Sequence, residues 1–310
     1  MRFFSPKSSD LWTRDPDRLK KWKFFKEEIR LRIDPPFLIR PQTKIFCMGS
    51  CFALEIKKVL RDRGYAVRPE EPGKGVELVH FNTFTMLQEF EKAFGLWKQD
   101  PDDFWYVDRA KSGKTYRYFQ DPYRRQVYAE SLEGIRSMTA EFDRAVRQGI
   151  DESDLYILTL GLVEVWKKKN NGRYAYAQPG DSHGGGHGEV DFVQSNFEEN
   201  FSNLKKMVQL IQSKFPERHV VVTVSPVPLS HTFGGNDVFT ANAESKAVLR
   251  AVAGQLSRDF RNVHYFPSFE ICSMAEKYGL AKVYEADGRH VRKKTVETIM
   301  EIFLEAYRAP

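Results

Sequence analysis

The sequence has few cysteines and no long apolar segment. Only three cysteines occur in 310 residues, which excludes a disulfide framework. Residues 1–15 contain no apolar stretch of the length that a secretory signal needs. The longest β-branched apolar run, at 220–224, is far too short to span a bilayer. These absences predict a cytoplasmic protein with reduced thiols and no membrane span.

The sequence also lacks an internal repeat, a Walker phosphate-binding motif and a strong charge imbalance. Lys and Arg number 48 and Asp and Glu number 42, which gives a formal net charge of +6. Basic clusters at 20–26, 167–169 and 292–294 are interleaved with aromatic residues, a pattern also found in nucleic-acid-binding proteins. Because these clusters are scattered and acidic residues are nearly as numerous, we interpret them as solvated surface. No nucleic-acid partner is expected.

Five short apolar runs are present at 44–48, 65–68, 155–160, 219–224 and 263–266. Near-continuous runs indicate strands that are buried on both faces, as in a parallel sheet. Segments with apolar residues at helical spacing follow them at 52–63, 83–96, 197–215, 240–260 and 291–307. The expected buried face of segment 240–260 consists of Ala247, Val248, Ala251 and Leu256. This alternation predicts an α/β fold of the doubly wound type, with one domain over residues 44–310.

An N-terminal arm and two insertions add to this order. In the arm, residues 1–43, the basic segment 19–26 suggests an amphipathic surface helix, and Pro35-Pro36 favours extended chain. The first insertion, near 99–130, is expected to be a hairpin with its turn at 111–114. The second, near 167–192, begins like a hairpin and continues into a Gly-rich segment. Each insertion is interpreted either as a roof over a site or as a surface loop.

Polar residues follow the predicted strands, where the sites of doubly wound sheets form. Gly49 and Ser50 end the first strand and precede a helix, whose N-terminus stabilises a developing anion. Ser50 is therefore either a nucleophile or a helix N-cap. Asp287 and His290 precede the last helix, so the carboxylate can orient one imidazole nitrogen while the other accepts a proton. The alternative is a solvated pair at a helix start, but the combination with Ser50 favours catalysis.

Residues 49–53 read Gly-Ser-Cys-Phe-Ala, the motif after which the GSCFA domain family is named. The sequence resembles that family over roughly residues 40–307, with further similar segments at 160–166, at 225–229 and around Asn82. The family is similar to the SGNH/GDSL hydrolases, so the resemblance implies a three-layer αβα sandwich with a five-stranded parallel sheet. It also implies Ser50 as nucleophile, His290 as general base and Asp287 as its orienting carboxylate.

One segment departs from the SGNH pattern, in which Gly-x-Asn-Asp follows the third strand and the Asn donates to the oxyanion. Here Val163 replaces that Asn, and losing such a donor costs roughly 10²–10³ in rate. We hypothesise that Asn82 supplies the amide instead, its alternative role being a helix N-cap. Glu164 is expected to hold loops together. The expected oxyanion and substrate-binding residues are Gly49, Cys51, Asn82, Gly161, Glu164 and His231, the last with an exposed loop position as its alternative.

Other reactive side chains fit this chemistry less well. Cys51 lies one residue into the predicted helix, so its side chain is expected to point away from that of Ser50, which disfavours a cysteine nucleophile. His183 and His187 are metal-ligand types, as are Asp181 and Glu189 nearby. They lie in a Gly-rich loop that fixes no common face, so no metal and no cofactor is expected.

The sequence therefore predicts a serine-dependent O-acyl ester hydrolase or O-acyltransferase. Its substrate would be an acylated carbohydrate or a similar hydroxyl-rich small molecule, and the backbone N–H groups around Gly49 and Ser50 would hold the oxyanion with Asn82. Val163 favours one alternative, a non-catalytic carbohydrate-binding or scaffold protein of the same fold. A nucleic-acid-binding protein is the second alternative and has only charge in its support. The oligomeric state is left open.

Overall fold

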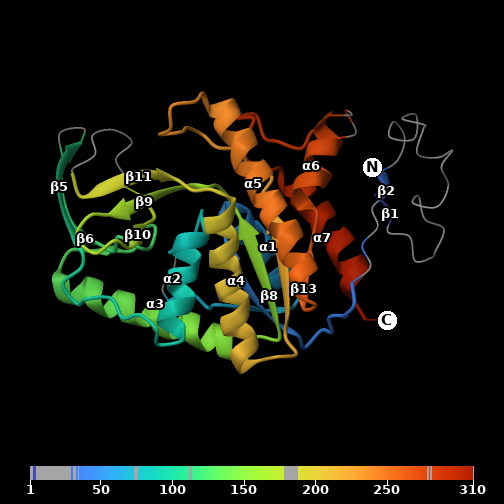
Figure 1. Ribbon diagram of the computed structural model, residues 1–310, viewed down its shortest axis with the longest axis horizontal. Coiled ribbons are helices and arrows are strands. Elements are labelled where there is room, and N and C mark those ends of the chain that lie inside the picture. The colour runs from blue at the N-terminus through green and yellow to red at the C-terminus, as the bar shows by residue number, and fades with distance from the viewer. Residues whose placement is uncertain are drawn as a thin grey trace.

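Five short strands form an all-parallel sheet at the centre of the computed structural model (Figure 1). The structure describes residues 3–4, 29–30, 33, 35–72, 76–111, 114–177, 188–277, 279 and 281–309. In sheet order the strands are β13 (Val263–Tyr265), β12 (His219–Val224), β8 (Leu155–Leu160), β3 (Lys44–Gly49) and β4 (Ala66–Arg68). Each coincides with one of the five apolar runs, so the predicted parallel sheet is confirmed.

Burial on both faces explains why these strands are so apolar. All six residues of β8 are buried, as are five of the six in β3 and in β12. The chain passes from β3 to β4 on one side and later returns to β8 on the other side of β3. The carboxyl ends of β3 and β8 therefore form a topological switch point, where ligands of doubly wound sheets bind.

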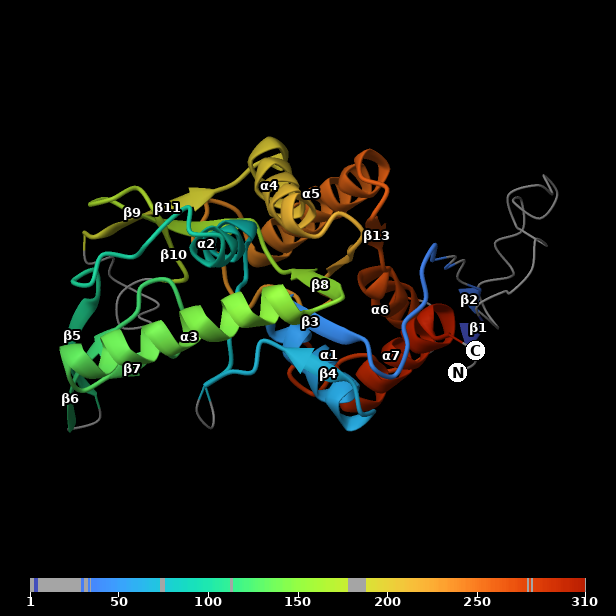
Figure 2. The same cartoon turned by 90° about the horizontal axis from the view of Figure 1, so that it is seen from below.

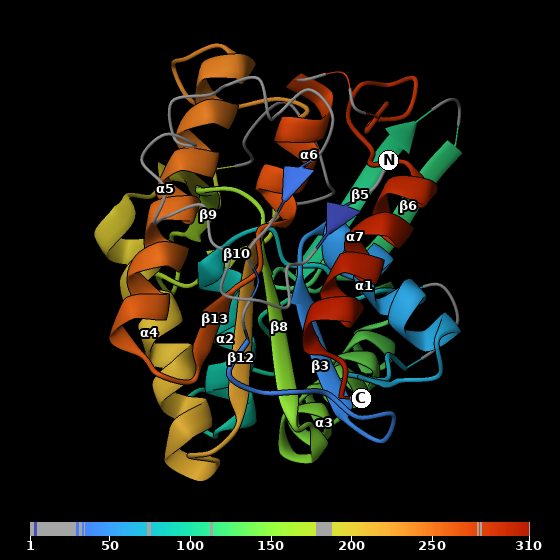
Figure 3. The same cartoon turned by 90° about the vertical axis from the view of Figure 1, so that its right-hand side faces the viewer.

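Helices cover both faces of the sheet, which gives three layers (Figures 2 and 3). One face packs against α2 (Thr83–Ala93), α3 (Leu132–Glu152), α4 (Phe197–Lys214) and α5 (Val238–Asp259). The other packs against α1 (Cys51–Asp62), α6 (Ser268–Lys277) and α7 (Lys293–Tyr307). The predicted three-layer sandwich is thus confirmed, and α3 and α6 are helices that the sequence analysis did not predict.

The predicted buried face of α5 is confirmed at Leu256 and, in part, at Val248, which is half-buried and packs against the core, but it is wrong at Ala247 and Ala251. Ala247 and Ala251 are exposed, whereas the buried residues of this helix are Ala241, Ser245, Lys246, Leu249, Val252, Ala253 and Leu256. The reason is that two polar residues are buried. Ser245 Oγ accepts a hydrogen bond from the Val163 N–H at 3.4 Å, and Lys246 binds backbone carbonyls. Hydropathy cannot identify a buried helix face whose polar side chains form hydrogen bonds with the backbone of a neighbouring loop.

Two small antiparallel sheets lie together at one end of the molecule, on the left in Figure 1. In the first, β5 (Trp105–Lys111) pairs with β6 (Lys114–Gln120), which pairs with β7 (Tyr128–Ala129), so the predicted hairpin is confirmed. In the second, β9 (Glu164–Lys168) lies between β10 (Tyr174–Ala175) and β11 (Val190–Gln194). Residues 112–113 and 178–187 lie outside the described part of the chain.

The described part of the N-terminal arm runs beside the C-terminal helix. The Ile39 N–H donates to Tyr307 O at 2.6 Å, and the Ala309 N–H donates to Ile39 O at 2.9 Å. Residues 35–38 form neither helix nor strand, and the chain bends at 36–37. Two short strands, β1 (Phe3–Phe4) and β2 (Ile29–Arg30), pair in parallel, and the suggested helix at 19–26 lies outside the described residues. Among the described helices, none combines the length and apolar character needed to cross a membrane.

Gly49 sets the geometry at the end of β3. Its φ is +144°, and a Cβ at this position would lie 2.1 Å from the carbonyl oxygen of Thr159 on β8. Only glycine permits both this backbone conformation and this approach. The residue after it, Ser50, therefore begins α1 directly beside the end of β8.

We expect Gly49→Ala to lower the free energy of unfolding by about 3 kcal/mol or more, because backbone strain and a clash with fixed backbone add together. Gly64→Ala is the matched control, since Gly64 has φ +85° but no heavy atom near the position of a Cβ. That variant should lose only the strain, about 1–2 kcal/mol. Urea unfolding measures both, and equal losses would contradict the steric role of Gly49.

Candidate active site

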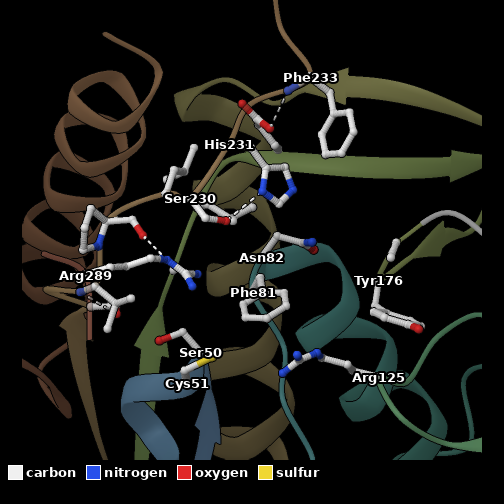
Figure 4. Close-up of a pocket in the computed structure, with 18 of the residues that line it drawn as sticks. Ser50, Cys51, Phe81, Asn82, Arg125, Tyr176, Ser230, His231, Phe233 and Arg289 are labelled. Carbon is white, nitrogen blue, oxygen red and sulfur yellow. Dashed lines mark hydrogen bonds between the residues drawn. The ribbon is translucent and has the colours of Figure 1, made fainter. Parts of the chain in front are cut away.

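A pocket of about 550 Å³ lies beyond the carboxyl ends of β3, β8 and β12 (Figure 4). Its floor includes the residues that follow these strands, Ser50, Gly161 and Ser225. Its walls come from the segments after β12 and before α2, from β9, and from the turn before α7. The other lining residues are Cys51, Phe81, Asn82, Arg125, Leu162, Glu164, Trp166, Tyr176, Ala177, Val227, Pro228, Leu229, Ser230, His231, Phe233 and Arg289.

Ser50 lies at the N-terminus of α1 and caps it. Its Oγ accepts a hydrogen bond from the Phe52 N–H at 3.3 Å, and the residue is only 4% exposed. The Ser50 N–H donates to Thr159 O at 3.1 Å. The expectation that this N–H holds an oxyanion is therefore wrong, because a carbonyl in the sheet already occupies it. Gly49 does not line the pocket. Because it has no Cβ, it allows β3 to approach Thr159 O on β8.

Cys51 occupies the first turn of α1 and lines the same pocket as Ser50. In Figure 4 the Ser50 hydroxyl and the Cys51 sulfur point to different sides of the start of α1, as expected, although both residues line the pocket. Cys51 is partly buried, whereas Cys47 and Cys272 are fully buried. The Cys51 N–H makes no hydrogen bond within the described part of the chain. It is therefore a backbone donor that remains available at a helix N-terminus.

Asn82 both caps α2 and lines the pocket, with a different atom for each task. Its Oδ1 accepts a hydrogen bond from the Thr85 N–H at 3.0 Å, as an N-cap does. Its Nδ2 makes no hydrogen bond to any described residue and remains available as a donor. The two roles that the sequence analysis set against each other are thus compatible.

Gly161 follows β8 and lies against Ser50. A Cβ at Gly161 would lie 2.6 Å from Phe81 O and 3.2 Å from the Ser50 Cβ, so a larger residue would push the pocket floor apart. Its N–H makes no hydrogen bond among the described residues. Val163 is buried and does not line the pocket.

Asp287 and His290 form a hydrogen-bonded pair in the turn before α7. His290 Nδ1 lies 2.5 Å from Asp287 Oδ2, while Asp287 Oδ1 accepts the N–H groups of Arg289 and His290 at 2.9 and 3.0 Å. The ring hydrogen bond, followed by the two backbone hydrogen bonds, lowers the pKa of Asp287 to about 2. The carboxylate is therefore ionised at neutral pH, and it leaves His290 Nε2 facing away from the pair.

His290 and the N-terminus of α1 are not joined. Among the described residues, no hydrogen bond links His290 to Ser50 or Cys51, and His290 does not line the pocket. Its neighbour Arg289 does line it, held by a hydrogen bond from Nε to Pro228 O at 3.1 Å. The same turn thus presents an arginine to the pocket and a histidine–aspartate pair to solvent.

Glu164 and His231 belong to the opposite wall. The Glu164 carboxylate accepts hydrogen bonds from the Thr232 hydroxyl and, at 3.4 Å, from the Phe233 N–H. It therefore holds the loop after β12, the structural role that the sequence analysis assigned to it. His231 lines the pocket, and its Nδ1 lies 2.7 Å from the Ser230 hydroxyl.

Lys246 lies buried behind the pocket without a carboxylate partner among the described residues. It is 3% exposed, and its Nζ donates to Gly161 O at 2.8 Å and to Val227 O at 2.9 Å. Burial, with a smaller contribution from the charge of Arg289, lowers its pKa to about 7. A neutral amine has two N–H donors, which match these two carbonyls.

Three of the functional groups described above were missed in the sequence analysis. Arg289 lies between the two residues of the Asp-x-x-His motif, and this position is the one feature of the sequence that could have identified it. No sequence feature marks Arg125 or Lys246, because only the folded chain brings the first insertion and α5 to the pocket. Asp181, His183 and His187 lie outside the described residues. Among the described residues, no cluster of His, Cys, Asp or Glu side chains is suited to a metal ion.

The sheet and its pocket define an α/β protein with a site at the carboxyl edge of parallel strands. The chain belongs to the GSCFA family, whose family model matches residues 44–303. The sequence matches none of the curated proteins with which it was compared.

Two solved structures resemble this chain in overall fold. One, from Streptococcus pneumoniae, is described provisionally as a platelet activating factor. It is 11% identical with a TM-score of 0.39, covering 86% of this chain and 85% of its own. The other is a carbohydrate esterase family 2 enzyme with a carbohydrate binding domain, from Corynascus thermopiles (Myceliophthora fergusii). It is 13% identical with a TM-score of 0.37, covering 88% of this chain and 68% of its own. At these values neither similarity bears on the activity of this chain.

The lowered pKa of Lys246 predicts a pH-dependent stability. A lysine of the unfolded chain titrates near 10.5, so between about pH 7 and pH 10.5 the unfolded state binds one more proton than the folded state. The free energy of unfolding should therefore rise with pH in this window, by up to about 1.4 kcal/mol per pH unit. Lys246→Met should remove this slope.

Urea unfolding of wild type and Lys246→Met from about pH 7 to about pH 10 measures the effect. Lys214→Met is the control, because Lys214 is exposed and paired with Asp151. The difference between wild type and Lys246→Met should change with pH in favour of wild type. A constant difference would show that Lys246 keeps its proton in the folded state.

Proposed function

We propose that this protein is an O-acyl ester hydrolase or O-acyltransferase that acts on an acylated carbohydrate or a similar hydroxyl-rich substrate. The observation that carries the proposal is that Ser50 lines one pocket together with three residues whose donors have no partner among the described residues. These donors are the N–H groups of Cys51 and Gly161 and the Asn82 side-chain amide. Acyl transfer needs such an arrangement, a nucleophile beside donors aimed at a developing oxyanion.

Ser50 is the proposed nucleophile. Its Oγ attacks the ester carbonyl, and its proton passes to His290 Nε2, while Asp287 stabilises the imidazolium. The tetrahedral intermediate expels the alcohol, which takes the proton back from His290, and leaves an acyl-serine. Water or a second hydroxyl then releases the acyl group by the same steps in reverse. The N–H of Cys51 replaces that of Ser50 as the backbone donor to the oxyanion.

His290 has to approach Ser50 for this reaction to occur. Its ring is exposed, and its one hydrogen bond to a described residue is the one with Asp287. Catalytic hydrogen bonds often form only in the complex with substrate. The absence of a hydrogen bond between His290 and Ser50 also supports a second candidate, a carbohydrate-binding protein of the same fold without catalysis. Turnover assays distinguish the enzyme from the binding protein.

Cys51 is the second candidate nucleophile. It lines the pocket from the first turn of α1, where a helix N-terminus stabilises a developing anion. With Cys51 as nucleophile, its own N–H would serve as the oxyanion donor, and Ser50 would serve only as the N-cap.

Labelling with a fluorophosphonate probe and turnover of p-nitrophenyl acetate identify the nucleophile. Ser50→Ala should abolish labelling and lower kcat by at least about 10³-fold. Ser50→Asn should do the same while keeping an acceptor for the helix cap. Ser213→Ala, at an exposed position of α4, is the control.

Cys51→Ser and alkylation with iodoacetamide test the alternative, because the other two cysteines are buried. Full activity of Cys51→Ser would exclude a cysteine nucleophile, and loss of activity in Cys51→Ser with retention in Ser50→Ala would overturn the role of Ser50. If the wild-type protein is neither labelled nor active on any ester, the proposal that it is an ester hydrolase or acyltransferase is wrong.

Asn82→Ser tests the oxyanion donor separately from the helix cap. Serine keeps a cap acceptor for the Thr85 N–H but removes the amide donor, so stability should change little while kcat falls by roughly 10²–10³. Circular dichroism and urea unfolding report the cap, and initial rates report the donor. An unchanged kcat with an intact fold would exclude Asn82 from the oxyanion site.

A further inference from the structure

Two arginines extend into the pocket from different sides (Figure 4). Arg289 comes from the turn before α7, and Arg125 comes from the segment between β6 and β7. Both side chains are partly buried. The sequence separates them by more than half of the chain, so the pocket is the place where the fold brings these two charges together.

Neither arginine is neutralised by a described residue. Arg289 uses Nε to bind Pro228 O, and its two terminal nitrogens make no hydrogen bond or ion pair with any described residue. Arg125 makes no hydrogen bond or ion pair in the described ranges, and its guanidinium lies 5.7 Å from the centre of the Phe81 ring. Each guanidinium therefore keeps donors that face the pocket.

The neighbouring Arg124 shows the contrast. It is fully buried and binds Glu89 through two nitrogens at 2.7 and 2.6 Å, and Asp143 at 2.6 Å. A buried arginine of this fold thus has carboxylates built around it. Because Arg124 is clamped in this way, the backbone next to it is fixed, and Arg125 is held at the pocket.

The pocket has little negative charge to balance the two arginines. Glu164 is the one acidic residue among its described lining residues, and its oxygens are taken by Thr232 and Phe233. It forms no ion pair with either arginine. Partly buried charge without a partner is unfavourable, and it is stabilised when an anion enters. The planar guanidinium matches a carboxylate, sulfate or phosphate through paired hydrogen bonds.

We propose that this pocket selects an anionic ester, one whose alcohol or acyl part carries a carboxylate, sulfate or phosphate held by Arg289 and Arg125. This inference rests on the proposed function for the ester, but its anion recognition can be measured without turnover. Within acylated carbohydrates, it points to acidic sugars rather than neutral ones.

Matched substrates test the selectivity. 4-Acetoxybenzoate and 4-acetoxybenzamide have the same ester and nearly the same shape but differ in charge, and mono-p-nitrophenyl succinate places the anion in the acyl part. In wild type, kcat/KM should be roughly tenfold or more higher for an anionic ester than for its neutral counterpart. Whether the enzyme prefers the anion in the alcohol part or in the acyl part shows which part of the substrate the arginines hold.

The variants Arg289→Met, Arg125→Met and the double variant should bring this ratio close to one. Arg289→Lys should keep part of it, because lysine retains the charge but loses the paired hydrogen bonds. Arg144→Met, at an exposed position of α3 outside the pocket, makes the same change in net charge and should leave the ratio unchanged. The ratio is informative even if Arg289→Met disturbs His290, because both substrates then suffer equally.

Binding of inorganic phosphate provides the readout that does not need catalysis. At constant ionic strength, phosphate should raise the Tm of wild type and of Arg144→Met, but not that of the double variant. If no ester is hydrolysed and this stabilisation is seen, the proposed function fails and the anion site stands. If neutral and anionic esters react equally in all variants and phosphate has no effect on Tm, the proposed anion site is wrong, but the proposed acyl-transfer activity is retained.

Discussion

The contact between the ends of β3 and β8 is the interaction on which the site depends. Gly49 has no side chain, so the two strands approach closely enough for the Ser50 N–H to bind Thr159 O at 3.1 Å. On its other side, Gly49 O accepts a hydrogen bond from the His80 N–H at 2.8 Å. One residue thus joins the start of α1 to the sheet and draws in the segment that carries Asn82. The positions of Ser50 and of the Asn82 side chain follow from it.

Much of this fold is readable from the sequence, because its driving force is local. Strands buried on both faces must be apolar along their length, and all five were found in that way. Helix α3 was missed although Ile135, Phe142 and Val146 repeat at helical spacing, so the signal was present. Half of the face of α5, Ala247 and Ala251, was misassigned for a different reason. Ser245 and Lys246 are buried because backbone groups of the β8–β9 connection need partners, and such needs arise only in three dimensions.

The site was readable only where chemistry coincides with a motif. Ser50 after a strand and Asp287 three residues before His290 stand out in the sequence, and the structure brings the last two into contact. The place of Cys51 in the pocket was not excluded by its predicted direction, since the first residue of a helix can line the same pocket as its cap. Arg125 could not have been found, because its place is set by the burial of Arg124 among carboxylates some 35 residues upstream and 19 downstream.

The two helix caps that line the pocket also restrict which amino acids the chain can use there. Ser50 caps α1 and Asn82 caps α2, and each residue presents its remaining polar atoms to the pocket. Side chains that cap well are chiefly Ser, Thr, Asp and Asn. Of these, Ser and Thr carry the hydroxyl that the proposed acyl-serine chemistry uses, and only Asn offers an amide donor. The overlap of the two demands leaves very few substitutions at either position that keep both the helix cap and the chemistry.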